Sequence, residues 1–189
     1  MFYENKIKEI LFSNGFSEVM TYSFGDVGEV SLVKGLAEDK EKLRSSLGGG
    51  LLRSLSLNLY NAPVLGVKAV KIFELGNIFT DTEEKRYLGI AYDDGAKKSS
   101  FTDEVDMILA EIKRTLGVAT IECHMIQSKP YCIEIDIDEL ISNLVEPITY
   151  ESPSFQALPS MVYAPVSNYP FISRDIAMWV EESTTWEDV

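Results

Sequence analysis

The chain has 189 residues, of which 46% are hydrophobic and 11% aromatic, a composition typical of a folded globular chain rather than a disordered one. Its 30 acidic and 17 basic residues give a formal net charge of -13, which argues against strong direct binding to a nucleic acid. The acidic surface fits either a basic partner or a purely solubilising role. No apolar run approaches the roughly 18 residues of a membrane-spanning helix, so we expect no membrane span and a cytoplasmic location.

The first expected elements are a helix, a strand and a short second helix. Apolar residues recur at helical spacing from Phe2 to Asn14, and Gly15 follows as a left-handed C-cap. β-Branched and aromatic residues predict a strand from Phe16 to Phe24. A short helix is predicted from Asp26, as its N-cap, to Val33.

A leucine-rich helix is expected from Gly50 to Asn61, and Pro63 ends it. The glycines from Gly48 to Gly50 predict a flexible entrance to this helix. Backbone amides at a helix N-terminus attract anions, but the run lacks the Gly-Lys-Ser/Thr tail that completes a phosphate-binding P-loop. A tight helix entrance is therefore the better interpretation. The apolar stripe consists of Leu51, Leu52, Leu55 and Leu59.

Two strands and a long helix follow the central helix. Aromatic and β-branched residues predict strands from Val70 to Thr80 and from Tyr87 to Tyr92. The next helix is predicted from Thr102, as its N-cap, to Leu116, with acidic residues in its first turn.

The remaining elements predict the pairing of the sheet. Short strands are expected at Val118–Ile126 and Tyr131–Ile137, and Asp138 is expected to cap a short helix that ends at Leu144. The connection from Gln127 to Pro130 is too short for parallel strands, which need crossovers of about a dozen residues. The sequence therefore predicts an α+β fold for residues 1–150, with a mainly antiparallel sheet flanked by helices.

Residues 151–189 are expected to form an extended linker and the start of another domain. A strand is predicted from Arg174 to Val180, and Thr184 with Glu187 resembles a capping box at the start of a helix. Because no helix follows in the sequence, we expect that the chain is cut inside its final domain.

Three residues are candidates for a metal site, namely Cys123, His124 and Cys132. Zinc sites usually combine paired ligands at spacings such as Cys-x-x-Cys, and two sequential candidates suit a tetrahedral ion poorly. We expect no metal site, and free reduced thiols instead.

The predicted strand that begins at Val70 carries a family resemblance. The stretch from Phe73 to Thr82 resembles the second signature motif of class II aminoacyl-tRNA synthetases, in which a strand runs into Phe-Arg-x-Glu and the arginine grips the ATP phosphate. Phe79 stands at the phenylalanine, Thr80 at the arginine and Thr82 at the glutamate.

Other stretches extend this resemblance along the chain. Together with Phe73–Thr82, the stretches Gly15–Phe24 and Leu43–Leu52 are similar to the β subunit of phenylalanyl-tRNA synthetase, which carries a catalytic-like module without catalysis. Tyr169–Ala177 resembles the first strand of that subunit's ferredoxin-like anticodon-binding domain. The segment from Val118 to Lys129 lacks the His-Pro-Gly run often found in the family, so we expect a divergent, truncated member.

The resemblance implies a structural partner of a separate catalytic α subunit. The whole enzyme would use ATP and magnesium to attach phenylalanine to tRNA, whereas this segment would hold no cofactor and no catalytic residue. Part of the leucine stripe, Leu51, Leu52, Leu55 and Leu59, would pack on the α subunit together with Tyr60. The alternative is that all four leucines serve the chain's own core.

Two alternatives remain beside this hypothesis. An autonomous class II ligase needs a cation at the phosphate and a late Gly-x-Gly-x-x-Arg run, yet Thr80 replaces the cation and no glycine follows Gly117. A ligand-binding or adaptor domain unrelated to aminoacylation would use the same helices and strands. Assembly with an α subunit discriminates, because an unrelated adaptor has no reason to bind one.

Overall fold

The computed structural model describes residues 1–34, 37, 40–64, 66–94, 101–145, 147, 165, 168–169, 172, 174 and 176–185, with only the backbone at 101–103. The chain divides into two units, Met1–Tyr150 and Glu151–Val189. Each unit is described by itself.

The first unit is built on a five-stranded sheet with the order β1-β4-β5-β7-β6. The short strand β1 pairs parallel with β4, and all other neighbours are antiparallel. The predicted mainly antiparallel α+β fold is therefore confirmed. The predicted antiparallel pair of β6 and β7 is formed as well, although β6 begins at His124 rather than at Val118 and runs to Ser128. The strands are β1 (Ser17–Glu18), β4 (Val70–Phe79), β5 (Glu84–Asp93), β6 (His124–Ser128) and β7 (Tyr131–Asp136).

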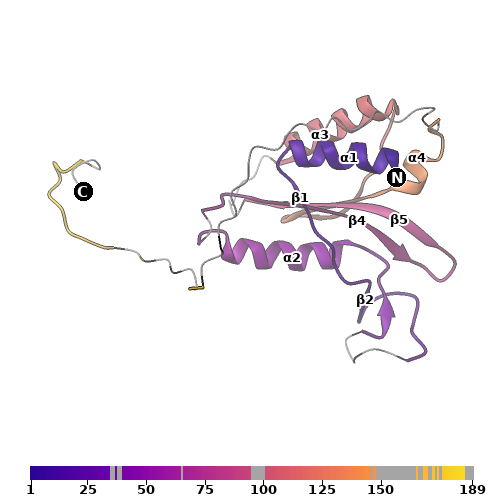
Figure 1. Cartoon of the computed structure of the whole chain (residues 1–189), viewed down its shortest axis with the longest axis horizontal. Helices are drawn as coiled ribbons and strands as arrows, with labels where there is room; N and C mark the ends of the chain where they lie inside the picture. Colours follow the sequence, from indigo (N-terminus) through magenta and orange to yellow (C-terminus); the bar gives the residue numbers. More distant parts are fainter. Residues whose placement is uncertain are drawn as a thin grey trace. The chain divides into compact units, whose positions relative to one another are not determined.

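Helices cover both faces of this sheet (Figure 1). Helices α1 (Phe2–Ser13) and α3 (Phe101–Leu116) lie over one face, and α2 (Gly48–Asn61) lies over the other. The short helix α4 (Ile137–Ile141) follows β7 directly. The three longer helices lie close to the ranges that their apolar spacing predicts, because each buries one apolar stripe.

Strand alternation divides the core into two layers. On β4, Phe73 and Leu75 join the core under α1 and α3, whereas Ile72 and Ile78 join the core under α2. The α2 layer is made of Leu47, Leu51, Leu55, Ala62, Val70, Ile72, Ile78, Ala91 and Cys132.

The segment between β1 and α2 differs from the prediction. The expected strand is formed only at Ser17–Glu18, and no helix runs from Asp26 to Val33. Instead, β2 (Phe24–Gly25) pairs antiparallel with β3 (Lys42–Leu43). The backbone amide of Leu32 donates to Glu41 O at 2.8 Å, so this segment satisfies its polar groups across a hairpin rather than along a helix.

Two predicted caps are displaced. Helix α3 begins at Phe101, so Thr102 lies inside it rather than before it. Helix α4 begins at Ile137, and its N-cap is Asp136 instead of Asp138. Asp136 has the extended backbone of an N-cap, and its carboxylate accepts from the Glu139 amide at 2.9 Å.

The second unit holds no strand among its described residues. Arg174 and residues 176–180 are exposed and belong to no strand, so the predicted strand Arg174–Val180 is not formed there. A strand needs a neighbour for its backbone groups, and the described part of this unit supplies none. Glu187 of the predicted capping box lies outside the described residues. No helix in the described part of the chain has the length and hydropathy needed to cross a membrane.

Candidate functional site

The motif-like positions Thr80 and Thr82 lie in the turn that joins β4 to β5. The Thr80 amide donates to Glu83 O at 2.9 Å, and the Thr80 hydroxyl accepts from the Glu83 amide at 3.2 Å. The hydroxyl oxygens of Thr80 and Thr82 lie 3.4 Å apart. Phe79, the last residue of β4, donates its amide to Arg44 O at 2.9 Å. At the position that the sequence resemblance aligns with the motif arginine, a threonine hydroxyl closes a hairpin turn.

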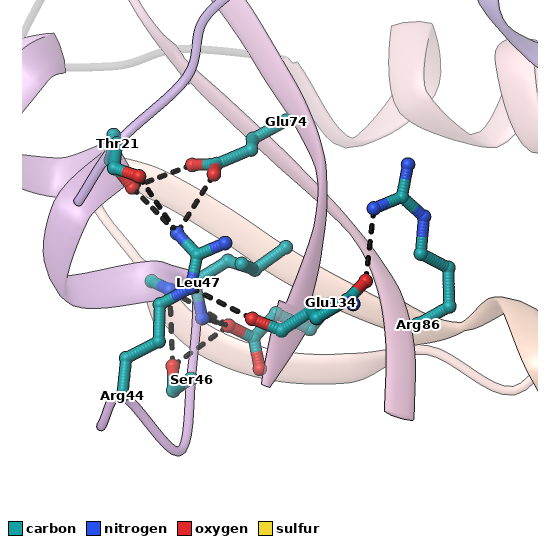
Figure 2. Close-up of polar contacts among 9 residues, drawn as sticks. Thr21, Arg44, Ser46, Leu47, Glu74, Arg86 and Glu134 are labelled. Carbon is teal, nitrogen blue, oxygen red and sulfur yellow. Dashed lines mark hydrogen bonds and ion pairs between the residues drawn. The ribbon is translucent and has the colours of Figure 1, made fainter. Parts of the chain in front are cut away.

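A second cluster, which the sequence did not single out, lies on the sheet face under α2 (Figure 2). Glu74 of β4 pairs in register with Gly89 of β5, which pairs with Glu134 of β7. The two glutamates are only 2% and 4% exposed. Buried carboxylates require partners, and both find them in the segment that leads into α2.

Glu74 forms a buried ion pair with Arg44. The Arg44 Nη1 atom lies 2.8 Å from Glu74 Oε1 and donates to the Thr21 hydroxyl at 2.9 Å. That hydroxyl donates to Glu74 Oε2 at 2.6 Å, and Arg44 Nε donates to Asn77 O at 2.8 Å. Removing one partner of such a pair typically costs about 3–5 kcal/mol, because the other charge stays buried.

Glu134 binds the N-terminus of α2. Its Oε1 atom accepts from the Ser46 hydroxyl at 2.7 Å and from the amides of Leu47 at 2.6 Å and Gly48 at 2.7 Å. Hydrogen bonds to a charged group contribute about 1.5–3 kcal/mol each, and a negative charge is favourable at a helix N-terminus. The predicted flexible entrance at Gly48 to Gly50 is therefore wrong, since the helix already begins at Gly48.

Two glycines let this segment approach the sheet. A Cβ atom on Gly89 would lie 2.4 Å from Leu51 Cδ1, and one on Gly76 would lie 2.3 Å from Arg44 Nη2. Leu51 and Arg44 therefore occupy the space that side chains at positions 89 and 76 of the sheet would otherwise fill.

The candidate interface residues on α2 fall into two groups. Leu51 and Leu55 are fully buried in the chain's own core, and Leu52 and Leu59 are half-buried against it. Tyr60 is 84% exposed. The exposed side also carries Leu57, which the leucine spacing missed and which is 65% exposed.

Cys132 lies in the same layer as α2 and is fully buried. Burial, and to a smaller extent the charge of Glu134, raise the pKa of its thiol to about 12. Cys123 is exposed. The buried thiol is therefore protonated at neutral pH and acts as a small core residue.

The arrangement under α2 acts as a clamp rather than as an open site. The Arg44 cation and the first amides of α2 are each held by a carboxylate of the same chain. The sequence contains a signal for this cluster, because Glu74 and Glu134 each have an apolar residue directly before and after them in a strand and a buried acid predicts a partner. It does not say which residues those partners are.

A mainly antiparallel sheet with helices on both faces is the fold of class II aminoacyl-tRNA synthetase cores. Apo histidyl-tRNA synthetase from S. aureus matches with a TM-score of 0.52 and 17% identity, over 66% of this chain and 32% of that one. Histidyl-tRNA synthetase from Nostoc sp. PCC 7120 matches with a TM-score of 0.47 and 15% identity, over the same shares. The chain thus spans about a third of these proteins.

The family is narrower than this class. The family model described as "Phenylalanyl tRNA synthetase beta chain CLM domain" matches residues 2–134. The chain belongs to this family and carries its catalytic-like structural module.

Proposed function

We propose that this module supports the ATP-dependent attachment of phenylalanine to tRNA by a cytoplasmic phenylalanyl-tRNA synthetase without carrying the active site. A catalytic α subunit is its partner and holds the active site. ATP and magnesium serve the whole enzyme, and tRNA is bound through the whole enzyme. The alternative of an adaptor unrelated to aminoacylation is not favoured, because the family match covers residues 2–134.

One observation carries the proposal. The Thr80 hydroxyl, which stands where class II enzymes place a cation, is hydrogen-bonded within its own turn. Activation of an amino acid by ATP needs fixed positive charge at the phosphate. Arg44 does not supply it, because its guanidinium is committed to Glu74 and to Asn77 O.

The α subunit is expected to bind the exposed side of α2. Leu57 and Tyr60 are three residues apart and therefore lie on one side of the helix, away from the buried Leu55. Exposed apolar residues that cluster on one surface commonly mark a protein contact. Leu51 and Leu55 support this surface from inside the core.

ATP–pyrophosphate exchange with phenylalanine tests the catalytic part of the proposal. We expect no exchange by this chain alone or by its Thr80→Arg variant, because the late glycine-rich arginine motif is also missing from the sequence. The positive control is a complete phenylalanyl-tRNA synthetase at the same concentration. Phenylalanine-dependent exchange by the chain alone would contradict the proposal.

Co-purification with a phenylalanyl-tRNA synthetase α subunit tests the structural part. We expect a stable complex that is seen by size-exclusion chromatography with light scattering. A histidyl-tRNA synthetase is the matched control, since it shares the fold class. Equal binding to both proteins, or to neither, would argue against the α subunit as the specific partner.

A further inference from the structure

We propose that Ser46, Leu47 and Gly48 form a carboxylate-binding site whose resident ligand is the chain's own Glu134, and that this internal ligand fixes where α2 begins. The site belongs to the chain itself and requires no partner subunit. Its test is therefore independent of the proposed function.

The donors converge on a single oxygen atom. Glu134 Oε1 accepts from the Ser46 hydroxyl, the Leu47 amide and the Gly48 amide at 2.6–2.7 Å. The Gly48 amide also lies 3.0 Å from the Ser46 hydroxyl oxygen. Three donors on one oxygen, with the residue 4% exposed, define a buried site suited to an anion.

The helix has no capping side chain at its N-cap position. Its N-cap position is Leu47, whose side chain makes no capping hydrogen bond, and its first turn contains no acidic residue. The first amides of a helix need an acceptor, and Ser, Thr, Asp or Asn commonly provides one at the cap. Here the acceptor comes from β7, 86 residues away from Gly48 in the sequence.

A second anchor shows that the whole entry segment is docked on the sheet. Arg44 binds Glu74, and Glu74 and Glu134 flank Gly89 in one row across three strands. The segment from Arg44 to Gly48 thus meets the sheet at two carboxylates of one face. A Cβ atom on Gly48 would lie 2.9 Å from Ile126 Cγ2, so the backbone lies close to β6 as well.

Chemical rescue with acetate tests the site, because acetate is a free carboxylate that fits the space vacated in Glu134→Ala. Loss of hydrogen bonds to a charged acceptor should lower the melting temperature of this variant by about 10 °C. We expect acetate to restore about half of that loss with saturable concentration dependence. Amide exchange measured by NMR should show protection returning at Leu47 and Gly48.

Two matched variants separate anion binding from general effects of salt. Ile133→Ala removes a buried side chain from the neighbouring position of β7 and should be destabilised without rescue by acetate. Glu134→Gln keeps an acceptor oxygen, so it should retain part of the protection at Gly48 and respond little to acetate. Sodium chloride at equal ionic strength is the salt control.

Each outcome decides the proposal. If Glu134→Ala does not fold alone, refolding by acetate followed by far-UV circular dichroism is the expected result. Unchanged stability of Glu134→Ala would overturn the proposal, as would equal acetate effects on Glu134→Ala and Ile133→Ala. Failure of acetate to stabilise or refold the variant would also overturn it.

Discussion

Single residues on the α2 face of the sheet show how burial changes their chemistry. Cys132 and Glu134 are two positions apart on β7, so both point toward α2. The glutamate stays in the core because its Oε1 atom accepts three hydrogen bonds. Burial keeps the neighbouring thiol protonated, with its pKa raised to about 12.

The two thiols should react very differently. A pH of 8 is far below the pKa of about 12 of the Cys132 thiol, so almost none of this fully buried group is the reactive thiolate. We expect a chromogenic disulfide reagent to titrate only the exposed Cys123 in the native chain. Both should react in denaturant. Rapid titration of two thiols in the native chain would show that the α2 layer opens readily.

At the scale of elements, α2 organises the molecule through both of its sides. Its inner side packs Leu51 and Leu55 on the sheet, and its N-terminus is bound by Glu134. Its outer side exposes Leu57 and Tyr60. Stability and assembly should therefore respond to different positions of one helix.

Substitutions at adjacent glycines of α2 should have opposite signs. Gly49 has no atom within 4 Å of an added Cβ atom, so Gly49→Ala should stabilise the chain by about 0.5–1 kcal/mol through helix propensity. On Gly50 a Cβ atom would lie 2.4 Å from the Thr21 hydroxyl oxygen, and Gly50→Ala should cost about 1–3 kcal/mol. Urea unfolding measures both, and equal shifts would contradict the placement of α2.

Charge on the outer side of α2 should weaken assembly. Tyr60→Glu places a carboxylate on the proposed contact and should reduce affinity for the α subunit at least about tenfold. Because Tyr60 is 84% exposed, the melting temperature of the chain alone should barely change. Met107→Glu, at a 65% exposed residue of α3, is the control. Equal affinity for both variants would place the interface elsewhere.

The sequence predicts the elements that local patterns determine. Apolar spacing locates α1, α2 and α3, and the short connection before Tyr131 identifies the antiparallel pair of β6 and β7. The sequence does not predict features that depend on contacts between residues far apart in the chain. The start of α2 depends on Glu134, and the replacement of the predicted helix after Asp26 depends on pairing with residues 41–43.

The candidate site likewise contains some residues that the sequence located and others that it did not. Thr80 and Thr82 are located by resemblance, and the structure adds that they close a hairpin turn. The clamp under α2 could not be predicted from local sequence patterns. Arg44 and Glu74 are 30 residues apart and meet only when the segment before α2 packs on the sheet.

At the scale of the whole molecule, the described core belongs to the first unit. The buried apolar residues of the described chain extend from Ile7 to Ile137. The catalytic-like module is therefore stabilised by packing within residues 1–150, where the chain also carries its family match.

Removal of residues 151–189 should leave this unit intact. We expect the shortened chain 1–150 to melt cooperatively within about 2 °C of the full chain, since a change of 1 kcal/mol shifts a domain of this size by only a few degrees. Differential scanning calorimetry makes the comparison. A broad transition, or a loss of more than 10 °C, would mean that the second unit contributes to the core.

The long separation between Glu134 and the helix it binds has a consequence for synthesis on the ribosome. Gly48 is translated 86 residues before Glu134, which at roughly 5–20 residues per second is an interval of about 4–17 seconds. Within that interval α2, β4 and β5 are synthesised before the carboxylate that binds the first helical amides. The N-terminus of α2 can therefore bind Glu134 only at a late stage of synthesis, after β7 has left the exit tunnel.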